Sequence, residues 1–108
     1  MKGERLGEFE EFTLLAVRAL GNDTYAVPVQ QFIEDHTRRA VSIGAVYAAL
    51  ARLETKGFLR SRMTEAVAQR GGKSKRVYTV TPSGSRTLEE LRDSRQRIWK
   101  QIAAGGRP

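Results

Sequence analysis

Apolar residues recur every three or four positions along much of the chain, a spacing that predicts helices with one buried face. A first helix is predicted from Leu6 to Leu20, and three glutamates in its first turn favour the positive end of the helix dipole. Pro28 opens a second, shorter helix, because the first helical position needs no hydrogen-bonded N–H. His36, the single histidine, is expected near the end of this helix, facing solvent or bonding a terminal carbonyl.

A third helix is predicted between Ser42, as its N-cap, and Gly57. Its core stripe is Ile43, Val46, Leu50 and Leu53. The opposite face combines small residues with one long cation: Ala45, Ala48, Ala49 and Arg52. Small side chains let a helix backbone approach a partner surface closely, but the high helix propensity of alanine explains the same composition. Both explanations stay open at this point.

The runs Phe58–Thr64 and Val77–Thr81 predict two strands of a hairpin. Between them, residues 65–76 hold Gly71 and Gly72 at a tip flanked by cations, where glycine permits a tight turn.

A last helix is predicted from an N-cap at Thr81, through Pro82, to about Ala103. One heptad-like stripe of apolar residues runs along this helix: Leu88, Leu91, Ile98 and Ile102. Arg95 occupies the remaining place of the stripe, and Trp99 lies beside it.

Composition narrows the function classes. A chain of 108 residues predicts one compact domain. With no cysteine and one histidine, a disulfide scaffold and a Cys/His zinc site are excluded, and we expect no metal and no cofactor. No apolar run approaches the roughly 20 residues that span a bilayer. The acidic N-terminal stretch is unlike a secretory signal peptide, so we expect a cytoplasmic protein without a membrane partner.

Positive charge is concentrated between residues 60 and 76. The whole chain carries 19 Lys and Arg against 12 Asp and Glu, a net charge of +7. Within this segment six cations stand against Glu65 alone, which leaves a net of +5: Arg60, Arg62, Arg70, Lys73, Lys75 and Arg76. Such a concentration is typical of a surface that binds a polyanion, although a solvated basic loop would have the same composition.

Three helices followed by a basic hairpin and a last helix predict an α+β fold that is mostly α. The arrangement is a winged helix-turn-helix with a C-terminal dimerisation helix, in which the third helix enters the DNA major groove and the hairpin lies along the backbone. We expect residues 1–81 to form the DNA-binding domain and residues 82–104 the dimerisation helix of the same compact unit. Residues 105–108 are expected to form a frayed tail.

The segment from Ile43 to Leu59 resembles the recognition helix of PadR-family transcriptional regulators. In that family a Ser or Pro precedes the pattern G-x-x-Y-x-x-L-x-R-L-E-x-x-G. The residues in register are Gly44, Tyr47, Leu50, Arg52, Leu53, Glu54 and Gly57. The stretches 70–84 and 6–20 are similar to the family's wing and opening helix, and a single helix after the wing resembles its short members. Two departures are Ala26, where relatives commonly have Gly, and Ala45, where many have Thr.

The resemblance implies a homodimeric DNA-binding repressor. We expect the third helix to contact double-stranded DNA through Ser42, Gly44, Ala45, Tyr47, Ala48 and Arg52. The predicted hairpin, which corresponds to the family's wing, is expected to contact the DNA through Arg70, Gly71, Gly72, Lys73 and Lys75. Arg52 is expected to reach a phosphate or a guanine edge, and Ala45 a thymine methyl or nothing. Tyr47 is expected to be half-buried, with its hydroxyl reaching the backbone.

Surplus apolar surface on the first and last helices predicts a two-fold dimer. The residues expected at its interface are Phe9, Phe12, Leu88, Leu91, Ile98, Trp99 and Ile102. The first-helix argument also counts Leu14, Leu15 and Val17 as surface that one small core does not cover. A monomer whose last helix folds over its own core is the alternative.

Trp99 is the only tryptophan and is a candidate for a small aromatic effector site between two subunits. Some short members of the family that this chain resembles bind aromatic drugs between paired tryptophans on the corresponding helix. Packing against Ile98 and Ile102 is the ordinary explanation, and Arg95, one turn earlier, is placed to cover the ring by a cation–π contact.

Two other function classes are less consistent with the residues present. An enzyme is disfavoured, because the chain has no cysteine nucleophile, no H-E-x-x-H motif and no phosphate-binding glycine loop. A winged helix that binds RNA or a protein partner without operator specificity is the stronger alternative. RNA readers display aromatic platforms, and the basic segment 60–76 contains no aromatic residue, which favours duplex DNA.

Overall fold

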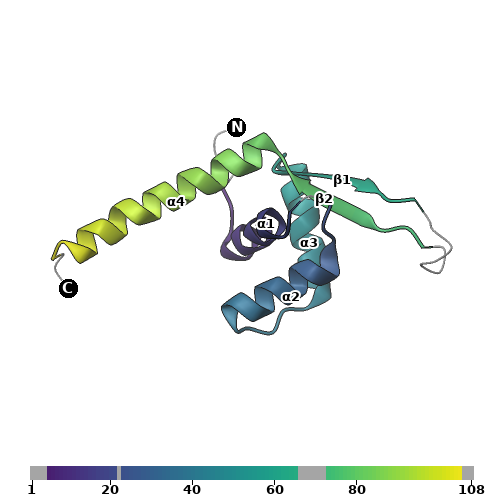
Figure 1. The fold of residues 1–108 in the computed structure, drawn as a ribbon, viewed down its shortest axis with the longest axis horizontal. Helices are drawn as coiled ribbons and strands as arrows, with labels where there is room; N and C mark the ends of the chain where they lie inside the picture. Colours follow the sequence, from purple (N-terminus) through teal and green to yellow (C-terminus); the bar gives the residue numbers. More distant parts are fainter. Residues whose placement is uncertain (1–4, 22, 66–72, 106–108) are drawn as a thin grey trace.

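The computed structural model describes residues 5–21, 23–65 and 73–105. Its elements are α1 (Glu8–Leu20), α2 (Ala26–Thr37), α3 (Ile43–Thr55), β1 (Leu59–Met63), β2 (Arg76–Val80) and α4 (Pro82–Ala103). Three helices form a body from which α4 and the β1–β2 hairpin project in opposite directions (Figure 1). This arrangement stretches the molecule to 60 × 32 × 20 Å. The predicted fold class, mostly helical with a small antiparallel sheet, is confirmed.

Helix α1 lies at the centre of the core and contacts α2, α3, β2 and α4. Its buried positions Leu14 and Val17 are fully enclosed by the protomer's own core. Phe9 and Phe12 are partly buried against the same core, and the Arg39 guanidinium lies 5.6 Å from the centre of the Phe12 ring. The expected surplus of apolar surface on α1 is therefore wrong for most of these residues, since α4 and the hairpin also pack on this helix.

Local sequence determines most helix starts. The Ser42 hydroxyl accepts a hydrogen bond from the Ala45 N–H at 3.0 Å, so the predicted cap of α3 is confirmed. Thr81 caps α4 in the same way, with Pro82 following as predicted. Helix α2 begins two residues before Pro28, because a proline is tolerated anywhere in a first turn whose N–H groups have no helical partner. The His36 ring bonds the carbonyl of residue 32 and is exposed, as predicted.

The hairpin is anchored to the body at its base. The two strands pair from Leu59 with Val80 to Met63 with Arg76; β1 is one residue shorter at each end than the predicted run, and β2 is shifted by one residue towards the N-terminus. The Tyr78 N–H donates to the Thr24 carbonyl at 2.7 Å, so the turn between α1 and α2 adds a third backbone segment beside β2. The predicted tip residues Arg70, Gly71 and Gly72 lie outside the described residues.

Helix α4 starts in close contact with the hairpin. A Cβ on Gly84 would collide with the Phe58 carbonyl oxygen and lie 2.9 Å from a Val80 methyl, so only glycine fits here. One turn later Leu88 is buried in the protomer's own core. This corrects its predicted place at a dimer interface, because a side chain already buried adds little surface to a partner. No helix among residues 5–21, 23–65 and 73–105 is long and apolar enough to cross a membrane.

Candidate nucleic-acid interface

The outer face of α3 is made of small residues. Three of the four residues predicted for the core stripe, Val46, Leu50 and Leu53, are fully buried, whereas Ile43 at the start of the helix is exposed. Ala49 is also fully buried, which corrects its predicted place on the opposite face. The centre of the exposed face is formed instead by Gly44, Ala48 and Ala51. All six positions predicted to contact DNA from this segment are exposed: Ser42, Gly44, Ala45, Tyr47, Ala48 and Arg52.

Tyr47 marks the edge of this face nearest the hairpin. Its side chain is 55% exposed, close to the expected half-burial. The expected hydrogen bond from its hydroxyl to the backbone does not occur among the described residues. Nearby in β2, burial raises the pKa of Tyr78, opposed by Arg76 and assisted by Glu54 and Tyr47.

Arg52 marks the opposite edge, where α3 meets α1. Its Nε donates to Glu10 Oε2 at 2.7 Å, while its side chain remains half-exposed. Glu10 Oε1 accepts two further bonds, one from Lys56 Nζ at 2.7 Å and one from the Gly7 N–H at 3.0 Å. Lys56 also donates to the Arg5 carbonyl. A single buried carboxylate therefore joins the start of α1 to the last two turns of α3.

The three bonds to Glu10 determine its ionisation. Burial alone would raise the pKa of this carboxyl, but the bonds from Lys56, Gly7 and Arg52 outweigh it and lower the pKa from 4.5 to about 2. From the sequence, Glu10 was expected only to favour the helix dipole. Its ion pairs could have been suspected from two features: Glu10 lies three residues after Gly7, and Arg52 and Lys56 are spaced i and i+4.

The cations at the base of the hairpin have different surroundings. The Lys75 ammonium lies 4.3 Å from the centre of the Tyr25 ring and its side chain is partly buried, whereas Lys73 is exposed. Arg62 donates to Asp23 at 2.9 Å, which ties β1 to the turn after α1. Arg60 is exposed on the same strand. The cations that the described part of the hairpin exposes to solvent are Arg60, Arg62, Lys73 and Arg76.

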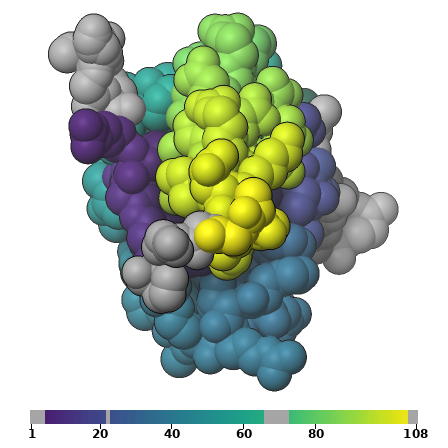
Figure 2. All heavy atoms as spheres, turned by 90° about the vertical axis from the view of Figure 1, so that its left-hand side faces the viewer, coloured from purple at the N-terminus to yellow at the C-terminus, as the bar shows by residue number. Residues whose placement is uncertain are grey.

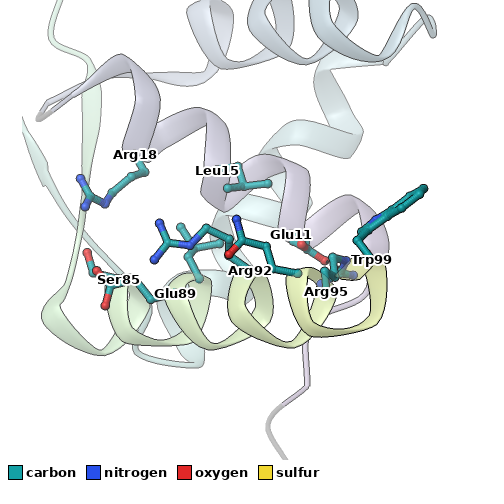
Figure 3. Close-up of a pocket in the computed structure, with 10 residues that line it drawn as sticks. Glu11, Leu15, Arg18, Ser85, Glu89, Arg92, Arg95 and Trp99 are labelled. Carbon is teal, nitrogen blue, oxygen red and sulfur yellow. Dashed lines mark hydrogen bonds and ion pairs between the residues drawn. The ribbon is translucent and has the colours of Figure 1, made fainter. Parts of the chain in front are cut away.

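A groove of about 410 Å³ runs between α1 and α4. Figure 3 shows Glu11 and Leu15 of α1 facing Arg92 and Arg95 of α4, with Trp99 at one end of the groove. Arg95 donates to Glu11 at 3.0 Å rather than covering the Trp99 ring, so the expected cation–π contact is replaced by an ion pair. Trp99 itself is 65% exposed. Among the described residues no cluster of three or more histidines or carboxylates suits a metal ion.

Glu10 should make stability depend on acid pH. Its pKa is depressed in the folded chain, so its contribution is complete above pH 4.5 and is lost as the pH falls through about 2. We expect Glu10→Gln to lower the free energy of unfolding by about 2–3 kcal/mol at pH 7 and by much less near pH 2. Urea denaturation across this pH range measures the difference. Glu8→Gln, an exposed residue of the same turn, controls for the loss of one negative charge. A deficit that stays constant from pH 7 to 2 would contradict the assignment.

The chain matches a known protein family over most of its length. The model of the transcriptional regulator PadR-like family matches residues 14–90. The chain is 32% identical to the transcriptional regulator Rv3488 of Mycobacterium tuberculosis over 101 residues, covering 88% of this chain and 90% of that protein.

Solved structures share the fold of this chain. A PadR-like transcription factor from Bacteroides fragilis is 23% identical, with a TM-score of 0.73 over 89% of this chain and 87% of that one. Bordetella bronchiseptica BpsR, whose DNA binding is regulated by 6-hydroxynicotinic acid, is 20% identical, with a TM-score of 0.68 over 100% of this chain and 69% of that one. The family match and the curated relative show that this chain belongs to the PadR-like family of transcriptional regulators.

Proposed function

We propose that the protein is a homodimeric repressor that binds a specific double-stranded DNA operator through the exposed face of α3. The observation that carries this proposal is the row of small residues Gly44, Ala48 and Ala51 between Tyr47 and Arg52. The major groove of DNA is about 12 Å wide and admits an α-helix. A face without long side chains lets the α3 backbone come close to the base edges, while Tyr47 and Arg52 contact its two sides.

The wing supplies phosphate contacts in this proposal. Exposed cations on the hairpin release counterions from DNA, which gives affinity without sequence preference. Lys73 and Arg60 are exposed there, and Lys75 is positioned by the Tyr25 ring. The tip residues Arg70, Gly71 and Gly72 extend the same contact by their place in the sequence. No aromatic platform for unstacked bases occurs in segment 60–76, so duplex DNA is favoured over RNA.

The DNA proposal is tested by gel shift with the chain's own upstream region and a scrambled duplex. We expect a clear preference for the upstream region. Lys73→Ala should weaken binding to both duplexes alike and lower the salt slope by about one unit. Ala48→Glu should remove operator binding, because a carboxylate then faces the phosphates from the centre of the α3 face.

Ala104→Glu is the matched control, since it introduces the same charge at an exposed position at the end of α4. Equal operator affinity of Ala48→Glu and Ala104→Glu would show that the α3 face is not the interface. Equal affinity of the wild type for upstream and scrambled duplexes would remove operator specificity from the proposal.

Dimerisation is proposed through the outer half of α4. Beyond Leu91 this helix leaves the protomer's core, and Figure 2 shows its C-terminal half standing out towards the viewer from the body. Ile98, Trp99 and Ile102 are each more than half exposed along one side of this half. An apolar stripe of this kind on a projecting helix is stabilised by burial against another surface. A second copy offers the same stripe across a two-fold axis, with Leu15 beside it on α1.

The dimer is tested by sedimentation at tens of micromolar. The expected species has twice the 12.1 kDa mass of the chain. Ile98→Glu should shift the equilibrium to monomer, because two carboxylates would be buried near the two-fold axis. Gln101→Glu, an exposed non-stripe position of α4, should remain dimeric. A 12.1 kDa wild-type species under these conditions would overturn the proposal.

An aromatic effector is proposed to bind in the α1–α4 groove beside Trp99. The groove combines apolar lining from Leu15 and Leu88 with charges from both helices, so it suits a planar ring with a polar substituent. Support comes from the fold relative BpsR, whose DNA binding is regulated by 6-hydroxynicotinic acid, a small aromatic acid.

Tryptophan fluorescence tests the effector proposal, because Trp99 is the only tryptophan of the chain. Titration with a panel of planar aromatic cations and aromatic carboxylic acids should give saturable quenching for one class. Loss of operator binding at the same ligand concentration, absent in a dimeric Trp99→Ala variant, is the expected functional result. Unchanged emission across the panel would leave Trp99 with a packing role.

A further inference from the structure

The guanidinium of Arg52 is held from one side only. Its Nε–H donates to Glu10 Oε2 at 2.7 Å, and an arginine carries four further N–H groups on its two terminal nitrogens. Within residues 5–21, 23–65 and 73–105 the structure shows no hydrogen bond from those terminal nitrogens, and the side chain is 52% exposed. The donor end of Arg52 is therefore free while its near end is fixed.

Glu10 is a rigid anchor for this contact. Its side chain is only 8% exposed, and both carboxylate oxygens are occupied. Oε1 accepts from Lys56 Nζ and from the Gly7 N–H, and Oε2 is left to Arg52. The carboxylate cannot turn to follow another partner without losing a bond on the opposite oxygen.

Lys56 is the informative comparison within the same cluster. Its ammonium donates both to Glu10 and to the Arg5 carbonyl, and its side chain is 21% exposed. Both acceptors belong to the same protomer, so the Lys56 ammonium is already paired. Arg52, one turn earlier, lies seven residues after Ala45 and four after Ala48, along one side of the α3 face.

We propose that Glu10 is a positioning residue for DNA recognition, which aims the terminal nitrogens of Arg52 from the α1 edge of the α3 face towards the duplex. The proposal rests on the function proposed above and adds to it the residue that orients one contact. An arginine whose near end is already ordered loses less rotamer freedom when it binds a base edge or a phosphate. Holding the guanidinium plane also favours the bidentate geometry that guanine offers.

A double-mutant cycle on operator affinity tests the proposal. We expect Glu10→Gln to weaken operator binding about three- to tenfold when Arg52 is present, because the side chain then has to be ordered on binding. In an Arg52→Gln background, the same Glu10→Gln change should have no further effect. Glu8→Gln is the matched control, since it removes the same charge from an exposed residue of the same helical turn, whose partner is Arg39. It should leave operator affinity within about twofold of the wild type.

Equal losses from Glu10→Gln in both backgrounds would overturn the proposal and leave Glu10 with a purely structural role. If Glu10→Gln does not fold, Glu10→Asp serves instead, because it keeps the charge but shortens the reach to Arg52 by one methylene, and the same dependence on Arg52 is expected. Wild-type protein that binds no duplex would contradict the proposed function itself. Wild-type binding with an additive cycle would contradict only the role of Glu10.

Discussion

The whole fold depends on one short helix that packs against every other layer. Helix α1 has 13 residues, and it contacts α2, α3, β2 and α4. Its middle, with Thr13, Leu14 and Val17 fully buried, supplies the apolar contacts. Its first turn supplies the polar ones, in which Glu10 binds α3 and Glu11 binds α4. A 108-residue chain can bury only a limited core. Because these contacts are concentrated on one helix, 13 residues are enough to hold the other elements in place.

The α3 face follows from this packing. Because Val46, Ala49, Leu50 and Leu53 are used to cover α1 and the rest of the core, the outward positions are free of packing demands. At the centre of this outward face, Gly44, Ala48 and Ala51 carry almost no side-chain bulk. The high helix propensity of alanine explains two of these residues, whereas glycine at position 44 lowers the helix propensity. A close approach of α3 to another surface is the reason proposed above for a glycine at this position.

The sequence predicts those features that depend on neighbouring residues. The caps at Ser42 and Thr81, the hairpin and the helix order each follow from a few adjacent positions, and the structure agrees with them. The wrong predictions concern which surface a residue of a periodic pattern packs against. A heptad-like stripe cannot distinguish Leu88, buried in its own protomer, from Ile98, which is exposed.

Glu10 was missed for a similar reason. Its partner Arg52 is 42 residues away, and a glutamate in a first helical turn already has a sufficient local explanation in the helix dipole.

Two ion pairs in the first turn of α1, Glu10 with Arg52 and Glu11 with Arg95, join the surfaces to which the functions are proposed. Glu10 and Glu11 are adjacent, yet one contacts the helix proposed to bind DNA and the other contacts the helix proposed to form the dimer. Glu11 and Arg95 also line the α1–α4 groove. A ligand that displaced Arg95 from Glu11 would therefore act on the same helical turn that holds Arg52. Packed cores shift as units rather than deforming continuously, so a displacement of this turn would be felt at the edge of the α3 face.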